Sequence, residues 1–91
     1  MSEKSWEIEL SKDSWKFLKK IEKRVSLRIL EKLEELEKCQ NPAFLRNVKP
    51  LAGKLLGFFR LRIGNFRIIF ELDWNDKRIG ILAFVPRGDA Y

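Results

Sequence analysis

Three arginines lie close together in the sequence, within two short segments that are otherwise apolar. Arg60 and Arg62 alternate with apolar residues, and Arg67 follows the dipeptide Gly64-Asn65. A two-residue turn of type II′ or I′ at this dipeptide would join the flanking segments in a β-hairpin. Because side chains alternate along a strand, the three guanidinium groups would share one face. Arginine forks match phosphate oxygens, so the pattern favours a phosphate-bearing ligand.

The same turn sets the register of the hairpin and places Arg62 directly opposite Arg67. Like charges at facing positions destabilise a sheet by roughly 0.2–1 kcal/mol, and a broken local rule is typical of a functional site. The opposite face would carry the core residues Phe59, Leu61, Ile63, Phe66, Ile68 and Phe70. In the alternative interpretation the arginines form an ordinary solvated face and pair with Glu71 or Asp73.

The charge of the chain is unevenly distributed. The formal net charge is +6, and the segment 49–70 contains Lys49, Lys54 and the three arginines without any acidic residue. This pattern predicts an anionic partner, but basicity alone does not say which one. A second basic group in the first predicted helix could extend the surface or form a solvated outer face: Lys16, Lys19, Lys20 and Lys23.

The remaining segments are expected to support this hairpin. Alternation predicts a strand at residues 6–10, helical spacing predicts a helix over about 12–23, and a second amphipathic helix follows a join near 24–26. Strands are expected at 58–63, 66–72 and 78–85. The resulting order is β-α-α-β-β-β. It indicates an α+β fold with a helical hairpin packed on a mainly antiparallel four-stranded sheet.

Length and composition narrow the class of protein. A chain of 91 residues predicts a single domain over residues 1–91. The single Cys39 and the absence of His predict neither an internal disulfide nor a zinc site. No cofactor is expected. Neither a signal peptide nor a membrane segment is predicted from the N-terminal sequence, so the cytoplasm is the expected location.

Several segments of the sequence together resemble a known family. The sequence resembles the RelE/ParE superfamily of bacterial and archaeal toxins in the step Leu51-Ala52-Gly53, the run from Phe59 to Phe70, the pair Pro86-Arg87 and the residue Tyr91. The β-α-α-β-β-β order agrees with that family. The sequence is most similar to the RelE branch, and the similarity extends over nearly the whole chain.

The resemblance implies a function and a set of site residues. RelE-like toxins cut mRNA in the ribosomal A site, and a RelB-like antitoxin blocks them. The catalytic residues implied by the resemblance are Arg60, Arg62, Arg67, Arg87 and Tyr91. Lys49 and Lys54 would help to hold RNA. A ParE-like inhibitor of DNA gyrase and an inactive RNA- or antitoxin-binding member are the alternatives.

The residue types restrict the chemistry that the chain could perform. Attack of a ribose 2′-OH on the neighbouring phosphate needs charge stabilisation and a proton acceptor. Arginines supply the first and, being permanently protonated, not the second. The chain has arginines at positions 60 and 62, where some relatives carry lysines, and it has no His. We therefore expect weak intrinsic nuclease activity, with alignment of the RNA provided by the ribosome.

Overall fold

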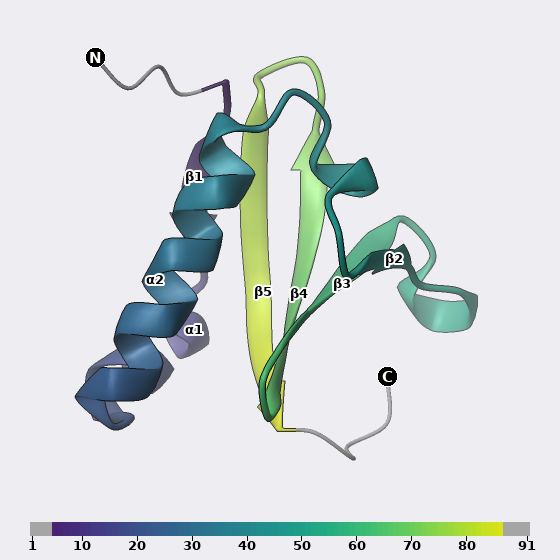
Figure 1. Cartoon of the computed structure of the whole chain (residues 1–91). Coiled ribbons are helices and arrows are strands. Elements are labelled where there is room, and N and C mark those ends of the chain that lie inside the picture. Colours follow the sequence, from purple (N-terminus) through teal and green to yellow (C-terminus); the bar gives the residue numbers. More distant parts are fainter. Residues whose placement is uncertain (1–4, 87–91) are drawn as a thin grey trace.

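Two helices cover one face of a single five-stranded sheet in the computed structural model, which describes residues 5–86 (Figure 1). The helices are α1 (Lys12–Lys20) and α2 (Lys23–Lys38). The strands are β1 (Glu7–Leu10), β2 (Val48–Pro50), β3 (Phe58–Ile63), β4 (Phe66–Asp73) and β5 (Arg78–Pro86). Two single-turn 3-10 helices, at Pro42–Phe44 and Gly53–Leu55, flank β2. Neither helix is long and apolar enough to span a membrane in the described part of the chain.

The strand order in the sheet is β1-β5-β4-β3-β2. β1 pairs with β5 in parallel, and every other pair is antiparallel. This confirms the expected α+β fold, with β5 in the interior of the sheet. The sheet has five strands rather than four because β2, expected as loop, pairs with β3. A strand that contains Pro50 fits this position, since proline is tolerated at a sheet edge.

The register of the β3–β4 hairpin agrees with the sequence prediction. Arg62 pairs with Arg67, and Ile63 pairs with Phe66. The backbone φ angle is +50° at Gly64 and is not positive at Asn65. A positive φ at the first turn position alone is the signature of a type II′ turn, one of the two expected types.

Helix α1 begins where the sequence predicts, but the join between the two helices lies earlier than expected. Ser11 caps α1, its Oγ accepting a hydrogen bond from the Ser14 backbone N–H at 3.1 Å. The helix ends at Lys20, and the join is at Ile21 and Glu22 rather than at residues 24–26. The apolar spacing runs through this short join without a Gly or Pro to mark it, so periodicity alone does not locate it.

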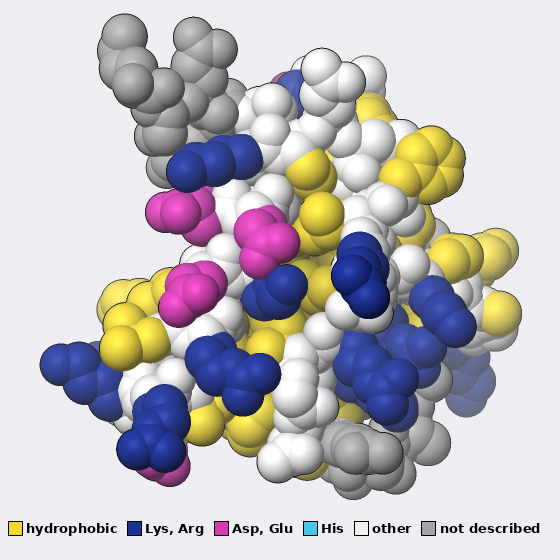
Figure 2. All heavy atoms as spheres, viewed as in Figure 1, with side chains coloured by type: hydrophobic (Ala, Val, Ile, Leu, Met, Phe, Trp, Pro, Cys, Tyr) yellow, Lys and Arg dark blue, Asp and Glu magenta, His cyan; other side chains and the backbone are white. Residues whose placement is uncertain are grey.

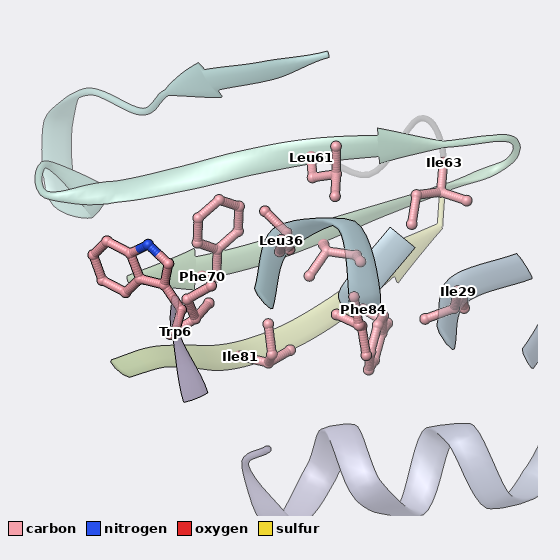
Figure 3. Packing of buried hydrophobic residues seen from close by; sticks show 11 residues of the cluster. Trp6, Ile29, Leu36, Leu61, Ile63, Phe70, Ile81 and Phe84 are labelled. Carbon is pink, nitrogen blue, oxygen red and sulfur yellow. The ribbon is translucent and has the colours of Figure 1, made fainter. Parts of the chain in front are cut away.

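The core lies between the sheet and the helices (Figure 3). Trp6, Leu36 and Phe70 are almost wholly buried there. Phe17 of α1 contacts Phe66 edge-on and stacks on Phe84, with ring centroids 5.3 and 5.2 Å apart. The sequence predicts that both Phe17 and Trp15 belong to the core rather than to a base-stacking surface. Phe17 does pack against the core, whereas Trp15 is 55% exposed, so the prediction for Trp15 is wrong.

A β-bulge interrupts β5 opposite the centre of β4. Ile69 pairs with Ala83 and Phe70 pairs with Ile81, which leaves Leu82 as the extra residue. The bulge lets both Ile81 and Phe84 face the core although they are an odd number of positions apart. The freed carbonyl of Leu82 accepts a hydrogen bond from Ser11 Oγ at 2.8 Å. The bulge therefore also ties the start of α1 to the sheet.

Candidate functional site

The face of the sheet that the helices leave open carries the three hairpin arginines. Arg60 and Arg62 point to this face from β3, and Arg67 points to it from β4, directly opposite Arg62. None of the three forms an ion pair within residues 5–86. Glu71 and Asp73 therefore do not neutralise these arginines, as the alternative interpretation required. Within the described residues, three positive charges therefore lie together without an acidic partner.

The floor beneath these arginines is apolar. Ile69 and Val85 lie on the open face, yet they are 0% and 5% exposed. Ile69 is the cross-strand partner of Arg60, and Val85 is the partner of Arg67. Long basic side chains at such neighbouring positions commonly cover apolar surface with their alkyl stems. An apolar floor lowers the local dielectric and strengthens the attraction of the guanidinium groups for a phosphate.

Arg60 is the most constrained member of the cluster. It is half-buried, and its Nε is inaccessible to solvent without a hydrogen-bond partner in the described part of the chain. A buried donor without a partner carries a desolvation penalty of about 1–3 kcal/mol. Such an atom is satisfied most simply by an acceptor that arrives with a ligand.

The lysines named from the sequence divide into two groups. Lys49 is the cross-strand neighbour of Arg60 and extends the basic row to the sheet edge. Lys54 lies in the 3-10 helix just beyond that edge, and it is exposed. The other four belong to the helices, on the side of the sheet away from the arginines: Lys16, Lys19, Lys20 and Lys23. The structure does not bring those four into the arginine cluster.

A further basic residue near the hairpin was not singled out from the sequence. Arg28, on α2, reaches the hairpin turn, and its Nη atoms lie 3.6 Å from the position a Cβ would occupy at Gly64. Only the packing of α2 against the turn brings it there, because the two segments are far apart in the chain. Figure 2 shows Lys and Arg gathered mainly in the lower half of this view, over the start of α2 and over β2 and β3. Arg87 and Tyr91 lie outside the described residues.

Several comparisons with known proteins agree with this architecture. The family model "ParE toxin of type II toxin-antitoxin system" matches residues 8–91. The archaeal RelE of a RelE–RelB complex from Pyrococcus horikoshii is 32% identical, with a TM-score of 0.78 over 94% of this chain and 99% of that chain. A search of curated protein sequences finds no match.

Two more distant structures support the fold alone. A chain of the RelBE2 toxin–antitoxin complex from Mycobacterium tuberculosis is 24% identical, with a TM-score of 0.75 over 90% of this chain and 98% of that chain. The isolated RelE toxin from E. coli is 13% identical, with a TM-score of 0.73 over 93% of this chain and 87% of that chain. With the family match and the archaeal relative, the chain belongs to the RelE/ParE superfamily of type II toxin–antitoxin toxins.

Proposed function

We propose that this toxin is a ribosome-dependent endoribonuclease that cuts mRNA in the A site and so arrests translation. The observation that carries the proposal is the cluster of Arg60, Arg62 and Arg67 on the sheet face away from the helices, with no ion pair to any residue between 5 and 86. The resemblance of the sequence to the RelE branch supports it, as does the RelE identity of the archaeal relative.

The cluster suits the charge that develops during RNA cleavage. When a 2′-OH attacks the adjacent phosphate, extra negative charge accumulates on the non-bridging oxygens. Arg62 and Arg67, held side by side by the strand register, would receive those oxygens. Arg60, with its unpartnered Nε, would hold the neighbouring part of the backbone together with Lys49. Binding an anion would also relieve the repulsion between Arg62 and Arg67.

Proton transfer is the step for which the described residues offer least. Permanently protonated arginines make poor bases, and the chain contains no His. By the family resemblance, Arg87 would provide further charge stabilisation and Tyr91 the proton transfer. The proposal is that the protein supplies electrostatic stabilisation and the ribosome supplies alignment of the 2′-OH.

The test is cleavage of mRNA on purified ribosomes, mapped by primer extension, together with protein synthesis in cells. Arg67→Ala should lower the cleavage rate by about 100- to 1000-fold, as loss of a transition-state donor typically does, without unfolding the protein. Lys38→Ala is the matched control, because Lys38 is an exposed cation at the far end of α2 from the hairpin turn (Figure 1). Undiminished cleavage by Arg67→Ala would refute the assignment.

A second candidate function is inhibition of DNA gyrase, since the matching family model is that of ParE toxins. This activity would depend on binding a protein rather than on stabilising a phosphate in reaction. Expression would then halt DNA synthesis before protein synthesis, and pulse labelling with thymidine and methionine distinguishes the two orders. No A-site cleavage together with early loss of DNA synthesis would favour this candidate.

We further propose that a RelB-like antitoxin is the partner of this toxin in the cytoplasm. Leu27 and Leu30 lie one turn apart on α2 and are each 50% exposed. Large apolar side chains on the surface of a helix are typical of an interaction site. Co-purification of a small protein encoded beside the toxin tests this partner, and replacing both leucines with Glu should weaken the complex.

A further inference from the structure

The open face of the sheet changes character from one end to the other. Towards the hairpin turn it carries the arginine cluster of Arg60, Arg62 and Arg67. Towards the β4–β5 turn it contains an open groove of about 740 Å³, and Phe58 stands at the border between the two. Aromatic, apolar and acidic residues and one arginine line the groove, among them Phe58, Glu71, Asp73, Trp74, Arg78 and Leu82.

The floor of the groove depends on a glycine. Gly80 pairs with Glu71 on the neighbouring strand, and a Cβ at position 80 would lie 3.3 Å from Glu71 Cγ. The missing side chain lets Glu71 lean across β5 within the groove. Leu82, displaced to this side by the bulge, forms part of the wall and is 41% exposed. Apolar side chains thus form part of the walls, and the Glu71 carboxylate lies in the middle of the groove.

Of the carboxylates in the groove, Glu71 alone remains without a partner in the described part of the chain. Glu9 forms an ion pair with Arg78 at 3.2 Å. Asp73 Oδ1 accepts a hydrogen bond from the Asp76 backbone N–H at 3.1 Å. Glu71 has no ion pair or hydrogen bond within residues 5–86. Its two oxygens are free to accept from a ligand.

We propose that this groove binds a guanine base of the RNA whose phosphate lies on the arginine cluster, an inference that rests on the proposed function. The groove disfavours a phosphate, because Glu71 and Asp73 would repel it and the lining cation Arg78 is paired with Glu9. A base can, since single-stranded RNA is read by stacking on aromatic side chains and by hydrogen bonds to exposed base edges. Guanine presents two adjacent N–H donors on its Watson–Crick edge, and these match the two oxygens of one carboxylate.

The spacing along β3 fits a nucleotide chain that runs along this strand. Arg62, Arg60 and Phe58 are alternate residues on one face, so neighbouring positions are about 6.8 Å apart. Phe58 pairs directly with Glu71 across the β3–β4 ladder. A base stacked on the Phe58 ring would therefore direct its polar edge towards the Glu71 carboxylate, next to a phosphate held by Arg60.

The test measures binding of short single-stranded RNAs to the full-length protein by fluorescence anisotropy. The RNAs carry 2′-O-methyl riboses so that they cannot be cut, and they differ at one central base. The wild type should bind the guanine RNA about tenfold more tightly than the uracil or inosine RNA, since one good base contact is worth that much discrimination. Inosine tests the contact directly because it lacks only the amino group.

Three variants separate base recognition from backbone binding. Glu71→Gln should remove the guanine preference, and Phe58→Leu should weaken binding of every base. Arg67→Ala should weaken all sequences equally and reduce the salt dependence. Glu31→Gln is the matched control: it makes the same charge change at an exposed site on α2 and should leave the preference intact.

Each contrary result has a distinct meaning. Absence of RNA binding by the wild type would overturn this inference, whereas the proposed function is tested separately by cleavage on purified ribosomes. Tight binding without guanine preference would overturn the inference alone. Glu71→Gln that tightens all RNAs equally would show simple repulsion and also overturn it. Loss of antitoxin affinity in Glu71→Gln, with RNA preference unchanged, would assign the groove to the protein partner instead.

Discussion

Replacing Arg62 with Glu should stabilise the fold while impairing RNA binding. Arg62 and Arg67 are direct cross-strand partners, and no carboxylate among residues 5–86 neutralises them. The change removes a repulsion of roughly 0.2–1 kcal/mol and adds an attraction of similar size, for a gain of about 1 kcal/mol. In a domain of this length that gain raises the melting temperature by about 4–8 °C.

Thermal unfolding at low and high salt is the appropriate assay. The gain should be largest at about 0.01 M salt and mostly lost at about 1 M, where charges are screened within about 3 Å. Arg62→Gln removes the repulsion alone and should give about half the gain. Arg46→Glu makes the same charge change in an exposed loop, and it controls for the effect of net charge.

Three results would refute this reasoning. If Arg62→Glu is no more stable than Arg62→Gln, the two side chains do not interact across the strands. If Arg46→Glu gives the same gain, the effect belongs to the net charge of the protein and not to the facing pair. Destabilisation by Arg62→Glu at both salt concentrations would show that the arginine contributes more through packing than it costs through repulsion.

Two further predictions concern residues outside the arginine cluster. Lys77 has a φ of +53°, and its Nζ lies 4.9 Å from the centre of the Trp6 ring and 5.2 Å from the centre of the Trp74 ring. Lys77→Ala should lower the free energy of unfolding measured in urea by about 1–2 kcal/mol, because both cation–π contacts are lost. Lys77→Gly should lower it less, because glycine accepts that backbone conformation. Burial, with the Glu35 charge adding to it, raises the pKa of the Cys39 thiol, so alkylation of the folded protein should reach half its maximal rate at a higher pH than in denaturant. Because the folded pKa is the higher one, this thiol should weaken the fold as the pH rises above the pKa of the unfolded thiol.

The hairpin was predictable because its signals are local. Gly64 supplies the turn conformation, and alternation on both sides then determines which residues face Arg62 and Phe59. β2 was missed because Pro50 and nearby glycines are typical of a loop, and only pairing with β3 makes the segment a strand. The start of α2 was misplaced because its N-cap residue, Glu22, makes no side-chain capping bond that the sequence could signal.

The candidate site was predictable where it depends on one hairpin and not where it depends on several strands. The facing arginines follow from the turn alone. The groove depends on Gly80 lying opposite Glu71 and on the bulge at Leu82, and both are properties of the β4–β5 pairing. Arg28 joins the surface through helix packing. The groove and the place of Arg28 could not be predicted, because the spacing of apolar residues within one segment carries no information about contacts between distant segments.

The parallel pairing of β1 with β5 bears on how the toxin is synthesised. β1 precedes the other strands in the chain, and within residues 5–86 its partner in the sheet is β5, the strand that follows all the others. An emerging chain therefore cannot complete its sheet until residues 78–86 have left the ribosome. Long-range pairing of this kind also slows folding. A newly made chain thus passes through an interval in which the β3–β4 hairpin with its arginines can already form while the core of the domain is unfinished.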